Sequence, residues 1–504
     1  MNAPSKGKTT MGLPDKRMTG LRWLALVVLC AGQMMIVIDQ NIVNVALPTV
    51  QSSLGFSSAN LVWVVNAYVI PFGGLLLLAG RLGDLVGRKY VFITGIALFS
   101  AASLLCGFAT TEAMLIIFRF LQGIGGAIAS ACILGMVATM YDEPRKQAQA
   151  IGAYSFASAG GGAVGPLLGG VLTDLVSWNW IFFINAPIGA AVVLVAMRAV
   201  PTDQGMGVRK GADFLGAALV TGGLMLLVYT IVNAENIGWG ATQTLVLVPV
   251  AVLLLVAFVV RQARAARPLV PLKIFSSRGL SVANVVQFLM IAGMFGLLFF
   301  GTLYLQRVLG YSSLQAGLAY VPIAVVIALI SLFLSARLIM RFGQRTILYT
   351  GLVLIVAAFA LLATVRVGGT FLADFLPATL LMGLGFGLAA PAMMGLGMSS
   401  VSPADSGIAS GLFNTTQQIG GAIGLTVLSA VVTARTDALL ASGEDESAAL
   451  VGAYRVAFVI AAVFVAAALV LAVALLRGSG QDTPEPAAEE PVDEPPAKTE
   501  PATA

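Results

Sequence analysis

The chain is a succession of long apolar runs separated by short polar segments. An α-helix needs about 20 mainly apolar residues to cross a bilayer, and its backbone groups are then paired within the helix. We count fourteen such runs and predict a membrane-spanning helix in each. The predicted spans are 22–47, 60–80, 90–108, 112–139, 148–172, 178–197, 212–233, 242–260, 279–301, 315–335, 346–365, 371–397, 405–433 and 452–476.

Composition supports an all-α polytopic membrane protein. Of 504 residues, 58% are hydrophobic and only 10% are charged, whereas soluble domains carry about 25% charged residues. The basic segment 1–21 precedes the first run, which contains Asp39. That run is longer than the apolar core of a cleaved signal peptide, about 7–15 residues. We therefore predict a retained first helix.

The distribution of basic residues predicts the orientation of the chain. With a cytoplasmic N-terminus, the inside segments hold 23 of the 28 Lys and Arg residues, and the outside loops hold four, Arg307, Arg366, Arg435 and Arg455. Membrane proteins concentrate Lys and Arg in their cytoplasmic loops. We expect a multi-pass protein of the cell membrane with both termini cytoplasmic. The Pro-, Glu- and Ala-rich segment 477–504 has the composition of a disordered tail.

An internal repeat divides the chain. Residues 80–89 (GRLGDLVGRK) align with 336–345 (ARLIMRFGQR) at an offset of 256, retaining Arg, Leu, Gly and a final base but losing the acid. Parallel repeats of this kind relate the two halves of some transporters. We predict a segment 1–21, a six-helix bundle 22–198, a two-helix insert with linkers 199–278, a six-helix bundle 279–476 and the tail 477–504.

Two charged residues lie inside predicted spans. Asp39 is roughly 13 Å in from Pro48, and Arg119 roughly 10 Å in from Glu112, at 1.5 Å per residue. Buried charges in a bilayer are costly and usually functional, so we expect these two to pair and Asp39 to carry protons. The alternatives are a structural carboxylate at a helix contact and an arginine that extends to the interface.

The hairpin between spans 2 and 3 holds four charges and three glycines within ten residues. A solvated turn that merely follows the basic-residue rule would need no fixed glycine spacing. We therefore expect a conformational role for the hairpin residues Gly80, Arg81, Gly83, Asp84, Gly87, Arg88 and Lys89.

Span 5 carries glycines at every fourth position. Gly161, Gly165 and Gly169 share one helix face, with Pro166 and Gly170 beside them. Small residues at this spacing let membrane helices approach closely. Plain helix packing is the alternative to a functional motif here.

Several functions lack support in the sequence. The chain has no histidine, and its cysteines, Cys30, Cys106 and Cys132, lie in apolar runs. The glycine-rich strings inside apolar helices have no preceding strand that would suggest a nucleotide site. We expect no metal, no cofactor, no nucleic-acid partner and no enzymatic activity.

Taken together, these motifs resemble those of the fourteen-helix drug:proton antiporters of the major facilitator superfamily. The resemblance covers roughly residues 20–476. The hairpin is similar to the superfamily signature, Arg119–Gly126 to the proton-linked motif of helix 4, and Gly165–Gly170 to the antiporter motif G-P-x-x-G-G. Asp39–Pro48 resembles the D-x-x-I-V-N-V-A-L-P string of the fourteen-helix branch.

The resemblance implies a major facilitator fold with two bundles that rock around a central cavity. It implies proton-coupled export of small amphipathic compounds, as in multidrug and antibiotic resistance, by a protein that functions as a monomer in the lipid bilayer. Asp84 would contact the start of span 13, near Asp405, in the outward-open form.

Some positions depart from the family pattern and bear on the substrate. Helix 2 carries neutral Asn66 where many cation exporters have an acid, which favours neutral or weakly charged substrates. Polar candidates for the substrate cavity are Asn44, Asn66, Gln122, Asn414 and Gln417. Import or exchange of a polar metabolite on the same fold, a membrane enzyme and a non-transporting sensor are the alternatives.

Overall fold

A computed structural model describes residues 16–140, 143–203, 213–238, 240–266, 268–401 and 406–476. All regular elements in these ranges are helices. In chain order they are α1 (Lys16–Leu54), η1 (Asn60–Val62), α2 (Trp63–Val86), α3 (Arg88–Gly107), α4 (Glu112–Thr139), α5 (Pro144–Leu175), α6 (Trp180–Phe183), α7 (Asn185–Ala199), α8 (Phe214–Ile237), α9 (Thr242–Arg264), η3 (Leu272–Ser276), α10 (Arg278–Leu303), η4 (Tyr304–Val308), α11 (Ser313–Ala319), α12 (Val321–Leu329), η5 (Ile330–Leu334), α13 (Ser335–Phe342), α14 (Gln344–Leu362), η6 (Phe371–Phe375), α15 (Leu376–Ser399), α16 (Ser406–Ala441) and α17 (Glu446–Leu476).

The helical class predicted from the apolar runs is confirmed. Thirteen helices in the described ranges are long and apolar enough to cross a membrane, and Ser313–Leu329 forms a shorter apolar stretch. That stretch falls in the tenth predicted span. Here the chain forms α11, α12, the π-turn η5 and α13 in succession, so this span is an interrupted helix.

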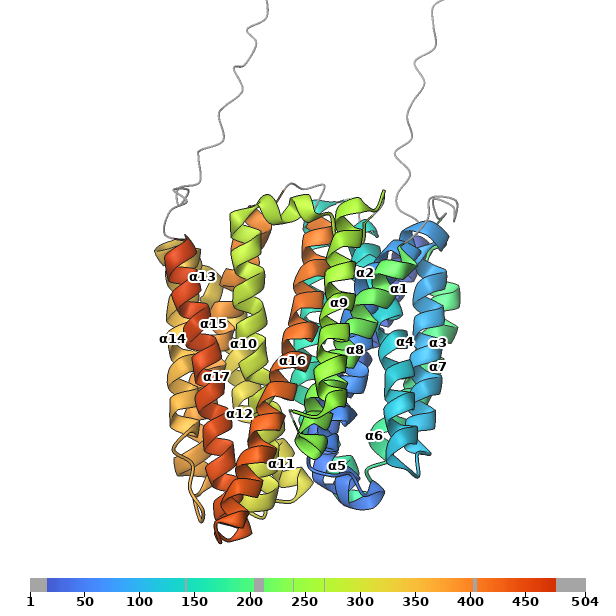
Figure 1. Cartoon of the computed structure of the whole chain (residues 1–504). Coiled ribbons are helices and arrows are strands. Elements are labelled where there is room, and N and C mark those ends of the chain that lie inside the picture. The colour runs from blue at the N-terminus through green and yellow to red at the C-terminus, as the bar shows by residue number, and fades with distance from the viewer. Residues whose placement is uncertain are drawn as a thin grey trace, which may run out of the picture.

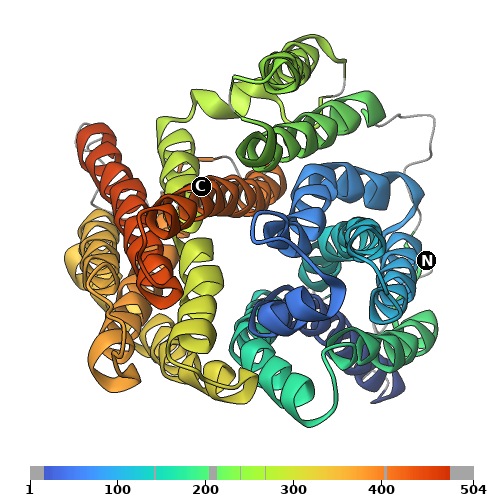
Figure 2. The ribbon, with the colours of Figure 1, turned by 60° about the horizontal axis from the view of Figure 1, so that its bottom comes forward.

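The helices gather into two bundles (Figures 1 and 2). The N-terminal bundle consists of α1 to α7, and in it α3 packs on α4 and α1 packs on α5. The C-terminal bundle consists of α10 to α17. In it α10 packs on both α16 and α17, and α14 packs on α15. The bundles meet along a seam where α2 lies against α16 and α5 against α11. The inserted pair α8 and α9 covers this seam on one side, with α8 against both α2 and α16.

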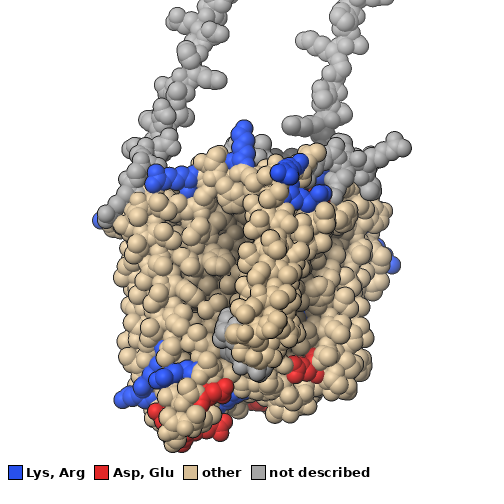
Figure 3. All heavy atoms as spheres, viewed as in Figure 1, with Lys and Arg blue, Asp and Glu red and all other residues tan. Residues whose placement is uncertain are grey.

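The two ends of the bundles define two faces. We call the face where α1 begins and α17 ends the terminal face, and the other the opposite face; the terminal face is at the top of Figure 1. In the view of Figure 3, Lys and Arg side chains lie along the terminal face without visible Asp or Glu side chains, whereas near the opposite face Asp and Glu side chains lie beside a second group of Lys and Arg side chains. Most of the surface between them is uncharged, as a surface in contact with lipid requires.

The internal repeat is visible in the backbone. Gly87 between α2 and α3 has φ +115°, and Gly343 between α13 and α14 has φ +80°. Each glycine lies between the end of one helix and the start of the next. The Gly87 amide donates to Gly83 O, and the Gly343 amide donates to Ile339 O. Positive φ is costly for residues with a Cβ, so both copies of the repeat need glycine at this turn.

The insert is tied together at the terminal face by Asp213. Its carboxylate accepts from the Gly216 amide at 2.9 Å, which caps α8, and from Arg261 Nε on α9 at 2.6 Å. Gln262 Nε2 donates to the second oxygen at 2.9 Å. Burial alone would raise the pKa of Asp213, but the hydrogen bonds, above all from Arg261, outweigh it and hold the pKa below its ordinary value.

Candidate functional site

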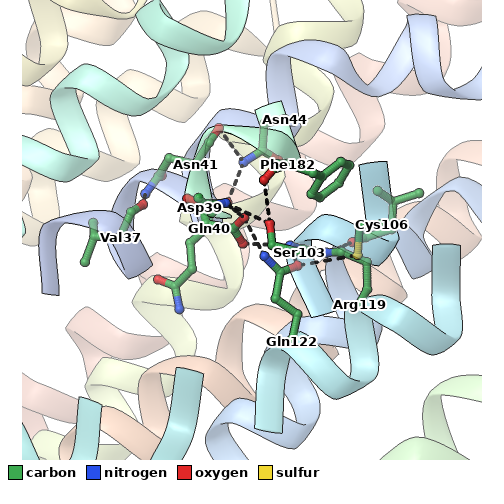
Figure 4. Close-up of polar contacts among 12 residues, drawn as sticks. Val37, Asp39, Gln40, Asn41, Asn44, Ser103, Cys106, Arg119, Gln122 and Phe182 are labelled. Carbon is green, nitrogen blue, oxygen red and sulfur yellow. Dashed lines mark hydrogen bonds and ion pairs between the residues drawn. The ribbon is translucent and has the colours of Figure 1, made fainter. Parts of the chain in front are cut away.

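A buried ion pair lies inside the N-terminal bundle, between α1 and α4. Arg119 Nη1 is 2.7 Å from Asp39 Oδ2, and the two side chains are 1% and 0% exposed. Figure 4 shows Arg119 and Gln122 pointing from α4 toward Asp39. The pairing that the matched depths predict is therefore present.

Two amides complete the coordination of Asp39. Gln122 Nε2 donates to Oδ1 at 2.7 Å, and Asn185 Nδ2, at the start of α7, donates to the same oxygen at 2.8 Å. Asn185 also donates to Ser103 Oγ, which donates to Phe182 O. Both carboxylate oxygens thus accept hydrogen bonds, as an ionised carboxylate in a buried site requires.

Arg119 is held by groups other than Asp39 as well. Its Nε donates to Val64 O on α2 at 3.1 Å, and its Nη1 donates to Gln122 Oε1 at 2.8 Å. The guanidinium carbon lies 4.4 Å from the centre of the Tyr68 ring, within the range of a cation–π contact. The arginine therefore links α4 to both α1 and α2, and it retains partners if its bond to Asp39 breaks.

Asn185 and Ser103 are members of the Asp39 network that the sequence does not predict. Asn185 is a polar residue well inside the apolar sixth run, beyond Asn179 at its start, and this position is the signal that could have identified it. Ser103 lies among small residues of span 3 and gives no comparable signal. Both are fully or almost fully buried.

The glycines of α5 face two different helices. A Cβ on Gly165 would lie 2.8 Å from Asn41 Cβ, and one on Gly169 would lie 2.5 Å from Ile42 O, both on α1. A Cβ on Gly161 would lie 3.0 Å from Met34 O, on the same helix α1. These glycines let α5 pack directly on the part of α1 that carries Asp39.

Gly170 and Pro166 face the C-terminal bundle instead. A Cβ on Gly170 would lie 2.5 Å from Ser313 O, and Gly317 of α11 lies directly against Pro166 O. The adjacent Asp174 carboxylate accepts from the amides of Ser313 at 3.1 Å and Leu314 at 2.8 Å. The motif of α5 thus joins the Asp39 helix to the seam.

The seam has further polar contacts toward the opposite face. Asn66 Nδ2 donates to Thr426 Oγ1 at 2.6 Å, between α2 and α16. Gln306 Nε2 in the π-turn η4 donates to Val45 O of α1 at 2.7 Å. These bonds connect the N-terminal bundle to the C-terminal bundle.

The hairpin residues lie at the terminal face. Asp84 and Arg88 form an ion pair at 3.0 Å, and Arg88 Nη1 donates to Gly135 O at 3.2 Å. A Cβ on Gly83 would lie 2.7 Å from Cys132 Sγ on α4. Gly80 lies near Ala131, and Arg81 is half-buried.

A carboxylate with no signal in the sequence binds the backbone amides at the start of α3. Asp203, after α7, accepts from the Arg88 amide at 2.8 Å and from the Lys89 amide at 3.2 Å. Lys89 Nζ donates to Met197 O. The predicted partner of Asp84 near Asp405 lies outside the described residues.

The five candidate cavity residues do not share one place. Gln122 belongs to the Asp39 network and Asn66 to the seam, and both are fully buried. Asn44 donates to backbone oxygens of its own helix, Gln40 and Asn41. Asn414 is exposed and Gln417 half-buried on α16.

This architecture defines the class of the protein. Two helical bundles related by an internal repeat meet along a seam, and a charged pair lies deep inside one of them; this is the arrangement of a secondary transporter. The chain belongs to the Major Facilitator Superfamily, whose family model matches residues 29–425.

Relatives and solved structures agree with this assignment. The chain is 38% identical to the puromycin resistance protein pur8 of Streptomyces alboniger, over 92% of this chain and 91% of that one. It is 37% identical to the cephamycin export protein CmcT of Amycolatopsis lactamdurans, over 92% and 94%. A bacterial homologue of the lysosomal transporter Spinster, inward-facing and occupied, shares the fold with TM-score 0.64 and 18% identity, over 92% of this chain and 99% of that one.

Proposed function

We propose that this chain exports small amphipathic compounds across the cell membrane in exchange for protons. Its relatives are named for resistance to, or export of, puromycin and cephamycin, and one similar chain is named a multidrug transporter, MdtP of Bacillus subtilis. The observation that carries the proton part is the Asp39–Arg119 pair, buried among donors. Of the described carboxylates inside the candidate spans, only Asp39 is fully buried.

The coordination of Asp39 gives a physical route from protonation to movement. Three donors bind its two oxygens, and an added proton removes the negative charge that strengthens these bonds. A neutral Asp39 leaves Arg119 as an uncompensated buried charge, which costs about 3–5 kcal/mol. Arg119 then bonds more strongly to Val64 O or Gln122, which changes how α4 packs on α1 and α2.

The α5 glycines would carry that change to the seam. Gly161, Gly165 and Gly169 face α1 near Asp39, and Gly170 faces α11 of the C-terminal bundle. We propose that residues 22–198 and 279–476 are the two units that rock, with the insert 199–278 beside the seam. The hairpin 80–89 would act on this motion and not on substrate.

We further propose that the terminal face is cytoplasmic and that a single chain suffices. Basic side chains along that face support the orientation, because cytoplasmic loops are rich in Lys and Arg (Figure 3). Bonds between the bundles toward the opposite face, such as Gln306 to Val45 O, support a form closed on the outer side.

Resistance and transport assays test this function. Cells that express the chain should grow at higher concentrations of puromycin or a cephamycin and accumulate less of the compound, and collapsing the proton gradient should abolish both effects. Cells that express Asp39→Asn at equal membrane levels provide the control. Accumulation of a polar nutrient with no change in drug resistance would instead support an importer.

A further inference from the structure

An open groove lies between the two inserted helices α8 and α9, at the end nearest the terminal face (Figure 1). Its volume is about 340 Å³, within the range of roughly 300–1,000 Å³ of small-molecule sites. The apolar walls are Leu215 and Leu219 of α8 and Ala257 and Val260 of α9. We call it the insert groove.

The walls of the insert groove face away from the rest of the protein. Leu215 is 53% exposed and Val260 is 42% exposed, whereas Thr221, on the face of α8 toward α2, is buried. Helix α9 packs mainly on α8, and only 11% of its apolar stretch is buried. An apolar helix surface that spans a membrane lies against lipid chains, so a lipid chain can reach this groove from the bilayer.

One end of the insert groove is basic. Arg261 and Arg264 lie in the last turn of α9, and both line the groove. They follow Ala257 by four and seven residues, so all three share one helix face. Lys and Arg side chains are visible at this end of the insert in Figure 3. The groove therefore passes from an apolar wall to a cationic end at the terminal face, the order of chain and headgroup in a phospholipid.

Both arginines have donors available for an anion. Arg264 is exposed and forms no hydrogen bond or ion pair within the described ranges. Arg261 uses Nε to bind Asp213, and in the same part of the chain its two Nη groups form no hydrogen bond. The Arg261 side chain is 40% exposed, whereas that of Asp213 is only 2% exposed. Arg261 thus offsets the Asp213 charge and still presents its Nη groups to the groove.

We propose that the insert groove binds one anionic phospholipid, with its phosphate on Arg261 and Arg264 and one acyl chain between α8 and α9. A guanidinium matches the geometry of phosphate oxygens, and basic pockets between membrane helices bind anionic headgroups. A basic residue at the end of a membrane helix needs no such ligand, but here two of them continue an apolar groove. Because the lipid touches both helices, it holds α9 on α8 beside the seam.

Native mass spectrometry of the delipidated full chain in detergent tests this proposal. The first molecule of dioleoylphosphatidylglycerol should bind about tenfold or more tightly than dioleoylphosphatidylcholine, which has the same chains but a neutral headgroup. Inorganic phosphate at the same concentration should not displace the lipid, because it has no chain to fill the groove.

A pair of arginine variants tests the basic end. Arg264→Gln should weaken binding of the first phosphatidylglycerol about fivefold, the effect of one basic residue beside an anionic lipid. Arg198→Gln is the matched control, since Arg198 is an exposed arginine in the last turn of α7 and lies outside the groove lining. It should leave the affinity unchanged.

A second pair tests the apolar wall. Ala257→Phe should fill the groove and weaken binding of the first phosphatidylglycerol severalfold. Val256→Phe makes a similar change at the preceding residue, which is 51% exposed and outside the lining, and should leave the affinity unchanged. All four positions are exposed, so the variants should fold.

Equal affinity for the two lipids would overturn the proposal, as would displacement by inorganic phosphate. So would equal affinities in Arg264→Gln and Arg198→Gln, or in Ala257→Phe and Val256→Phe. The measurement reports lipid binding alone, so its result stands whether or not the chain is a proton-coupled exporter.

Discussion

At the scale of single residues, the buried carboxylate of Asp39 and the donors around it form the centre of the proposed proton coupling. Arg119, Gln122 and Asn185 all donate to Asp39. Their positions on α4 and α7 mean that three helices share one buried charge. Loss of either charged partner leaves the other without compensation, which is more costly than loss of the pair.

We therefore expect non-additive effects of Asp39→Asn and Arg119→Gln on stability. Each single variant should lose about 3–5 kcal/mol, and the double variant should lose less than the sum by roughly 1–3 kcal/mol. Thermal unfolding in detergent measures these losses. Ser130→Ala, which removes another α1–α4 contact, is the control and should combine additively with Asp39→Asn. Additive losses for Asp39 and Arg119 would show that the pair is not a unit.

The sequence predicts the charged pair but not its full surroundings. Asp39 and Arg119 stand out because a charge within an apolar run is rare, and helical rise gives their depth. Which amides turn toward them depends on how α3, α4 and α7 rotate against α1. A single sequence contains no direct measure of that rotation, so Asn185 and Ser103 were found only in the structure.

At the scale of elements, α5 shows how glycine position decides the effect of a substitution. A Cβ on Gly165 would collide with Asn41, whereas one on Gly160 meets nothing within 4 Å. Alanine is favoured over glycine in a helix by about 1 kcal/mol.

Gly165→Ala should accordingly destabilise the protein and reduce export, and Gly160→Ala should be neutral or stabilising. The two variants make the same chemical change five residues apart on one helix. Thermal unfolding and drug accumulation in cells would measure both effects. Equal behaviour of the two variants would rule out the close α1–α5 contact as the reason for the glycine motif.

The insert gives a prediction for pH. The pKa of Asp213 is held below its ordinary value, mainly by Arg261 against the opposing effect of burial. Its stabilising contribution is then full above the unfolded-state pKa of about 3.9 and is lost as pH falls through the lower folded-state value. The thermal unfolding temperature of the wild-type chain should therefore fall as the pH is lowered through this acid range.

Asp213→Asn should remove this part of the pH dependence, while Glu444→Gln, at an exposed acid, should retain it. If Asp213→Asn and wild type lose stability in parallel as the pH falls, another group is responsible.

Several elements differ in detail from the predicted spans. The first span was predicted to end before Pro48, but α1 continues to Leu54, because a proline removes only one backbone donor and neighbouring helices hold the segment in place. The π-turns η4, η5 and η6 have no signature in the apolar pattern. The second span was predicted to end at residue 80, but α2 continues to Val86, so the turn of the hairpin is confined to Gly87. The insert helices α8 and α9 begin within two residues of the predicted runs, since long apolar runs leave little choice but a helix.

At the scale of the whole molecule, the seam between the bundles determines which face is closed. Asp174 bonds two amides of α11 across it. A carboxylate at such amides contributes about 1 kcal/mol through charge and dipole. The repeat predicts two bundles, but which residues touch across the seam depends on the conformation adopted, so the Asp174 contact could not be predicted from the sequence.

Asp174→Asn should therefore shift the protein toward a form open on the opposite face, by roughly fivefold in population for 1 kcal/mol. Spin labels at the exposed Leu175 and Leu318, on α5 and α11, would report a longer distance by electron–electron double resonance. Glu444→Gln, at an exposed acid on the same face, should leave the distance distribution unchanged. An unaltered distribution in Asp174→Asn would contradict a closing role for this contact.

The most direct test of the central claim is proton movement in proteoliposomes that contain the purified chain. The compound used is puromycin or a cephamycin, whichever the wild-type chain exports. Adding this compound should drive proton flux across the membrane. An imposed pH gradient should in turn drive accumulation of the compound. Asp39→Asn should lose both while still binding the compound. Proton flux and gradient-driven accumulation that are undiminished in Asp39→Asn would contradict the account.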